Sequence, residues 1–146
     1  MLIAYHGREA DKTAILSQLK AHREADDLVQ RYGYWEDGKG CAVGCTLHSD
    51  DHMEYETRFG IPVAIARLED SIFEGLPVDL ARAWPERLMS AIRPGSDLSR
   101  VHWHLLHWLA ARNAAGAAST ARSAAWVQIS DRLIALIEAA PDTDAV

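Results

Sequence analysis

The stretch Pro62-Val-Ala-Ile-Ala-Arg-Leu-Glu-Asp-Ser-Ile-Phe-Glu-Gly75 shows the helical period that dominates this chain. Proline fits the first turn of a helix and glycine is typical of the position after its end, so we expect a helix from Pro62 to about Glu74. Its apolar residues fall on one side, namely Ile65, Leu68, Ile72, Phe73 and Leu76. Glu69 falls among them, although a carboxylate is seldom buried without a partner.

Glu69 therefore has two interpretations. It could form a structural pair with an arginine or with His22. It could also be a metal ligand, or a general base whose pKa is raised by burial.

The same period recurs along the chain, and strand-like alternation is almost absent. Helices are expected at 11–31, 41–47, 50–60, 62–74, from Pro77, from Pro85, at 97–113 and from Ser119 or Thr120 to 140, the last with an apolar stripe. Three glycines and an Asp-Gly turn signal mark a loop near 33–40. We predict an all-α, compact single-domain bundle of about six or seven helices over residues 1–146, with 141–146 as a flexible tail.

Composition excludes several classes of protein. The chain has 146 residues and a net charge of −6, and its basic residues form no stripe, so we expect no nucleic-acid partner. No apolar run approaches the roughly 20 residues that span a bilayer, and the start of the chain lacks the pattern of a signal peptide. We therefore expect a cytoplasmic protein that does not bind membranes.

The first predicted helix carries an unusual pair on its apolar face. His22 and Asp26 are four residues apart, which places them on one side of a helix together with Ile15 and Leu19. A buried His–Asp hydrogen bond that fixes two helices would explain the pair. Alternatively, Asp26 could orient a His22 that takes part in chemistry.

The segment Gly38-Lys-Gly-Cys-Ala-Val-Gly-Cys-Thr-Leu-His48 is the most unusual part of the sequence. Gly40 permits a tight turn, and Cys41 at a helix start would have a lowered pKa. Cys41 is therefore a candidate nucleophile, with His22 as its base. Its spacing from Cys45 is not that of a disulfide oxidoreductase.

Zinc is a further possibility for this region. Cys41, Cys45, His48 and His52 read Cys-x3-Cys-x2-His-x3-His, which contains ligand types that zinc prefers. One continuous helix would place the first and last about 16 Å apart, so a break at Ser49 would be required. The spacing matches no zinc finger, and a cytosolic cysteine is more often a small buried residue.

The helix expected at 97–113 is apolar on most sides. Trp103, His104, His107 and Trp108 lie on or beside its outward faces. A helix of this kind is either central to a bundle or covered by a partner. These residues are a candidate interface and the main indication of a homo-oligomer.

Two functions remain open at this level. The first is a polar pocket that binds a small molecule or metal or supports cysteine chemistry; its candidate residues are His22, Asp26, Gly40, Cys41, Cys45, His48 and Glu69. The second is an acidic module that regulates or binds a protein partner without catalysis. In that case the buried polar groups only fix the fold. Neither an enzymatic reaction nor a cofactor follows from the sequence.

Overall fold

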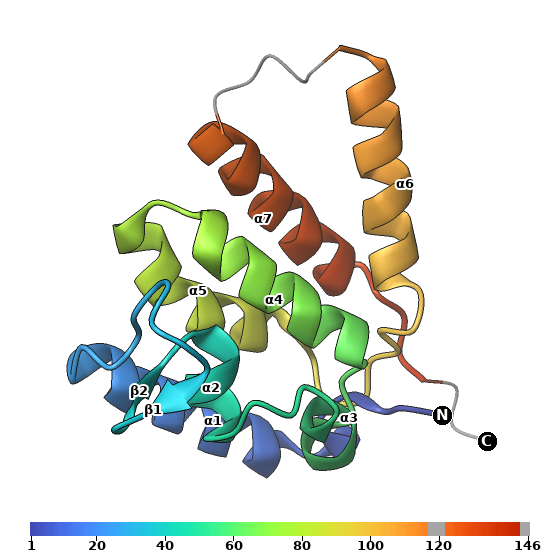
Figure 1. Cartoon of the computed structure of the whole chain (residues 1–146). Coiled ribbons are helices and arrows are strands. Elements are labelled where there is room, and N and C mark those ends of the chain that lie inside the picture. Colours follow the sequence, from blue (N-terminus) through green and yellow to red (C-terminus); the bar gives the residue numbers. More distant parts are fainter. Residues whose placement is uncertain (117–121, 144–146) are drawn as a thin grey trace.

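The computed structural model describes residues 1–116 and 122–143 (Figure 1). Within these ranges the elements are η1 (Ala4–Gly7), α1 (Glu9–Glu24), β1 (Trp35–Glu36), β2 (Lys39–Gly40), α2 (Ala42–Leu47), α3 (Glu54–Phe59), α4 (Val63–Gly75), α5 (Val78–Ala91), α6 (Val101–Ala114) and α7 (Arg122–Glu138). The predicted all-α bundle of about seven helices is confirmed. None of the described helices has the length and apolar character needed to cross a membrane.

Helix α4 lies in the middle of the bundle, with α7 on one side and α2 on the other (Figure 1). It also packs against α3, α5 and α6. The side that faces these neighbours carries Ile65, Ala66, Glu69, Ile72 and Phe73, all of which are buried. The sequence stretch that predicted a helix thus supplies the centre of the core, with a carboxylate inside it.

Helix α1 is shorter than expected. It ends at Glu24, and Asp26 has a left-handed backbone with φ of 58°. The chain then pairs with β2, because Val29 N donates to Gly40 O and Gly40 N donates to Asp27 O. These bonds hold the segment in an extended form and prevent the helix from continuing to residue 31.

Two further boundaries differ from expectation. The two short helices expected from Pro77 and Pro85 are one continuous helix, α5, with Pro85 inside it. The proposed start of the last helix at Ser119 or Thr120 lies outside the described residues. Of the expected tail, residues 141–143 are tied to the loop before α6, since Asp97 N donates to Pro141 O and Thr143 N donates to Gly95 O. Residues 144–146 lie outside the described part.

The glycine-rich segment forms a small hairpin. Trp35 pairs with Gly40 and Glu36 with Lys39 across a turn formed by Asp37 and Gly38. Both turn residues have positive φ, 51° and 76°, which is the conformation favoured in two-residue hairpins. The turn signal was predicted from the sequence, whereas the strands were not.

The hairpin packs on α2 through glycines. A Cβ atom on Gly44 would lie 1.3 Å from the carbonyl oxygen of Tyr34, and one on Gly40 would lie 1.9 Å from the same atom. The Tyr34 backbone thus occupies the space that two side chains would need. Glycine at these positions permits close packing of two backbone segments.

We expect Gly44→Ala to lower the free energy of unfolding by at least about 2 kcal/mol, because the added methyl group must displace backbone. Helix propensity alone predicts the opposite, an increase in the free energy of unfolding of up to about 1 kcal/mol. The control is Gly38→Ala, whose Cβ would meet nothing within 4 Å. Its backbone strain should cost about 1 kcal/mol. Urea denaturation of both variants measures the difference, and a stabilised Gly44→Ala protein would contradict the packing.

Candidate functional site

Two histidines meet at the junction of α1 and α2. His22 lies in the last turn of α1, and His48 is the C-terminal cap of α2. Their Nε2 atoms are 2.8 Å apart, and Nδ1 of His22 lies 2.9 Å from Oδ2 of Asp27. The three side chains therefore form a continuous hydrogen-bonded chain from a carboxylate to a surface imidazole.

Asp27, not Asp26, is the partner of His22. Helix α1 ends before the expected i,i+4 pair is complete, so Asp26 turns outward and forms an ion pair with Arg82. Asp27 takes its place because its backbone carbonyl accepts from Gly40 N at 3.0 Å. The predicted orienting carboxylate is thus present one residue further along the chain.

The distance between the two histidines depends on how α2 is held against α1. The side-chain amide of Gln18 donates to the carbonyl oxygens of Cys45 (2.8 Å) and Thr46 (3.0 Å). Gln18 lies one helical turn before His22, and the two carbonyls lie just before His48. The amide therefore fixes the ends of both helices where the histidines meet.

Trp35 covers the histidine pair. Its ring stacks on His48 with centroids 4.2 Å apart and planes inclined by 17°, and it contacts His22 edge-on at 5.4 Å. Beside this stack is an open pocket of about 540 Å³, lined by Gly33, Tyr34, Trp35, Glu36, His48, Ser49 and Asp50. The hairpin thus provides one wall of the pocket, and the segment after α2 provides the other.

The hydrogen bonds determine where the protons lie. A carboxylate only accepts, so Nδ1 of a neutral His22 carries the proton that it shares with Asp27. Nε2 of His22 is then an acceptor, and Nε2 of His48 must donate to it. This leaves a lone pair on Nδ1 of His48, which has no hydrogen-bond partner within residues 1–116 and 122–143. Partial burial, His22 and Arg58 lower the pKa of His48, which favours this neutral form.

The two cysteines are poorly suited to nucleophilic chemistry. Both are free and buried. Burial raises the pKa of Cys45 to about 12 and also raises that of Cys41. The Cys41 sulfur accepts a hydrogen bond from Gly44 N, and the Cys45 thiol faces backbone carbonyls of Asp27 and Gly40. Their surroundings favour thiols over thiolates.

The residues expected to bind zinc do not converge. His48 contacts His22, whereas Nε2 of His52 lies 3.9 Å from a carboxylate oxygen of Asp70. In the described part of the chain, no group of three or more histidines, cysteines and carboxylates is placed to hold a metal ion.

Glu69 lies in the core as expected, but in a different environment from the histidines. Oε2 of Glu69 accepts from the hydroxyl group of Tyr55 at 2.5 Å, and Oε1 has no partner in the described residues. Burial raises the pKa of Glu69 to about 8. The pair joins α3 to α4, and no hydrogen bond or ion pair links it to His22 or His48 within the described chain.

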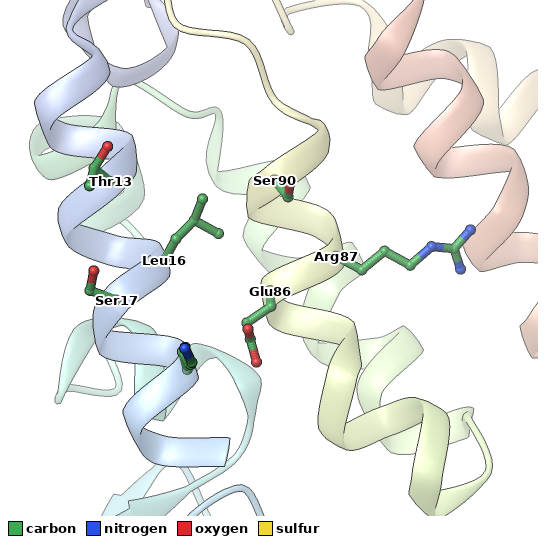
Figure 2. A pocket seen from close by; sticks show the side chains of 7 residues that line it. Thr13, Leu16, Ser17, Glu86, Arg87 and Ser90 are labelled. Atoms are coloured by element: carbon green, nitrogen blue, oxygen red, sulfur yellow. The ribbon is translucent and has the colours of Figure 1, made fainter. Parts of the chain in front are cut away.

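A second groove, of about 510 Å³, lies between α1 and α5, and its side chains are less suited to chemistry (Figure 2). Leu16 points from α1 toward α5, while Arg87 points away from α1 (Figure 2). Arg87 pairs with Asp131, and Glu86 pairs with Arg23. Since these charged groups already have partners, we do not place the site here.

The candidate interface on α6 is partly exposed. The side chains of Trp103, His104 and His107 lie on the surface, with Trp103 64% exposed. Trp108 is half-buried, and Arg112 and Arg132 each lie 5.9 Å from its ring centroid. Trp103 therefore remains available to a partner, whereas Trp108 belongs mainly to the packing of α6 on α7.

Several residues of the site were not predicted. Asp27 and Asp50 fall in segments expected to be helical, 11–31 and 50–60, and Trp35 and Glu36 fall in the loop expected near 33–40. The Asp26-Asp27 doublet after a helix was an available signal, because either residue could have been the partner of His22. The contact between Trp35 and His48 depends on the hairpin, of which the sequence predicted the turn but not the strands.

Glu69 should make stability depend on pH. Its folded-state pKa of about 8 lies above the ordinary value of 4.5, so the folded protein binds more protons than the unfolded chain between these values. Stability from this group is therefore complete at low pH and is lost as pH rises toward 8, by at most about 1.4 kcal/mol per pH unit. Denaturation of the wild type and Glu69→Gln at several pH values isolates this contribution. Parallel stability curves for the two proteins would show that Glu69 ionises normally.

No protein-family model, curated protein or solved structure matches this chain. Among the arrangements described above, the hydrogen-bonded chain from Asp27 through His22 to His48, beside the pocket, is the one best suited to acid–base chemistry.

Proposed function

We propose that the pocket beside His48 is an acid–base site that binds a small molecule and exchanges a proton with it. The observation that carries this proposal is the chain Asp27–His22–His48, with its distances of 2.9 and 2.8 Å. Two linked imidazoles, with a carboxylate at one end and a nitrogen without a hydrogen-bond partner in the described residues at the other, are suited to moving one proton. The free thiols fit the reducing cytosol, where we place the protein.

The proton transfer follows from the hydrogen bonds. Nδ1 of His48 accepts a proton from the bound molecule, and the proton on Nε2 of His48 passes to Nε2 of His22. The positive charge then resides on His22, between His48 and the Asp27 carboxylate, where an ion pair stabilises it. The reverse sequence returns the proton, so His48 acts as base and then as acid.

Trp35 and Gln18 would support this activity by positioning His48, and neither side chain takes part in the proton transfer. The stacked indole holds the His48 ring in one orientation, and the Gln18 amide holds α2 at a fixed distance from α1. A base positioned in this way loses little rotational freedom when its ligand binds.

Kemp elimination of nitrobenzisoxazole provides a test that does not require the natural ligand. In this reaction a base removes the proton on carbon, the C–H electron pair forms the nitrile, and the N–O bond breaks to release a phenolate. We expect the wild type to accelerate the reaction and His48→Asn to abolish at least about nine-tenths of the acceleration, within the range typical of a positioned base. Asparagine tolerates the left-handed backbone at this position, so the variant should fold.

The control is His104→Asn, which removes an exposed histidine of α6 outside the pocket and should leave the rate unchanged. Asp27→Asn should lower the rate, because protonated His22 loses the carboxylate partner that stabilises its charge. Equal rates for the wild type and His48→Asn would overturn the proposal.

A second function is favoured by the exposed part of α6. Trp103 is 64% exposed and Leu106 is 48% exposed, and both lie on the same outward side of the helix. Paired exposed apolar side chains of this size are typical of an interface, and a second copy of this chain is our candidate partner.

We expect the average mass of the wild type to rise with concentration in sedimentation experiments, and Trp103→Lys to abolish the rise. Leu80→Lys is the matched control, since Leu80 is 49% exposed on a different helix, α5. A monomer at all concentrations, or equal association of both variants, would contradict the interface.

A further inference from the structure

We propose that the pocket beside His48 selects a cationic small molecule, an ammonium or guanidinium compound with an apolar body. This inference rests on the proposed function, since it names the ligand class of the same site. It is drawn from the pocket lining, from the charges around that lining and from the protonation state of His48.

The lining combines aromatic rings with carboxylates. Tyr34 and Trp35 provide ring surfaces, and Glu36 and Asp50 provide negative charge. Two carboxylates alone would not define a site. An aromatic face beside a carboxylate does favour a cation, because the ring quadrupole and the charge act in the same direction.

The charges of the lining are not neutralised by the protein. No lysine or arginine lines the pocket, and neither Glu36 nor Asp50 forms an ion pair in the described part of the chain. Lys39 lies opposite Glu36 in the hairpin register but forms no ion pair with it. Arg58 is nearby but donates to Leu47 O and to Glu54. A ligand cation would therefore meet two free carboxylates.

At Tyr34 the field of the surrounding charges has the same sign, whereas Arg58 acts in the opposite direction at His48. Asp70, followed by partial burial and by weaker effects that include Asp50 and Glu74, raises the pKa of Tyr34. The carboxylates that raise this pKa place negative charge near the Tyr34 side of the pocket. An anionic ligand would be repelled there, and a cationic ligand would be attracted.

His48 fits a cation only in its neutral form. Its lowered pKa keeps the imidazole uncharged near neutral pH, so it adds no repulsion. Its free Nδ1 lone pair can accept a hydrogen bond from an N–H group of the ligand. The same atom that acts as base in the proposed reaction would thus recognise a protonated amine.

The test compares three probes of nearly equal size: phenethylammonium, phenethyl alcohol and phenylpropionate. Binding is followed by the NMR signal of the Trp35 indole N–H group as each probe is added to the full chain. We expect phenethylammonium to bind about fivefold or more tightly than the alcohol, in line with about 1 kcal/mol for a cation over an aromatic ring. Phenylpropionate should bind most weakly.

The double variant Glu36→Gln/Asp50→Asn should remove the preference for the cation. The control Asp37→Asn/Glu138→Gln removes the same net charge at residues outside the lining and should keep it. Equal binding of the cation and the alcohol, tighter binding of the anion, or no binding of any probe would overturn this inference.

These outcomes are independent of the elimination assay, whose substrate is uncharged. A His48-dependent elimination rate without cation preference would overturn the ligand class and leave the acid–base site. Cation preference without a His48-dependent rate would leave a binding site and overturn the reaction.

Discussion

The carbonyl group of Tyr34 lies where a Cβ atom of Gly40 or Gly44 would have to be, and the site depends on this close approach. It brings the hairpin into close contact with α2, where Trp35 stacks on His48. The same hairpin fixes Asp27 through its backbone contact with Gly40. A side chain at either glycine would move the wall of the pocket and the partner of His22 together.

The packing of these glycines gives a structural explanation for residues 38–48, the most unusual segment of the sequence. Glycines and cysteines next to a predicted helix start suggested a reactive thiol or a metal site. In the fold, the glycines permit backbone contact and both thiols are buried with raised pKa values. The chemistry that we propose lies instead at His48, where α2 ends, because that position is at the surface and meets a second helix.

Residues within a periodic helix could be predicted from the sequence, and residues placed by loops could not. The period of α4 was sufficient to place Glu69 in the core, since the direction of a side chain on a helix follows from its spacing. The same reasoning gave the wrong carboxylate at Asp26, because α1 ends at Glu24 where the chain pairs with β2. Tertiary contact decided that boundary, and no local pattern encodes it. The encounter of His22 with His48 likewise depends on how α1 and α2 pack.

The ends of α2 and α3 provide an independent argument that His48 has a role beyond the fold. Both helices end at a left-handed residue, Gly60 for α3 and His48 for α2. Glycine adopts this conformation without steric cost, whereas another side chain costs about 1 kcal/mol there. The fold alone would favour glycine at both ends. The imidazole at position 48 offsets part of that cost through its hydrogen bond and its stacking on Trp35. Within residues 1–116 and 122–143, Nδ1 of this imidazole has no hydrogen-bond partner, which leaves it available for the proton exchange that we propose.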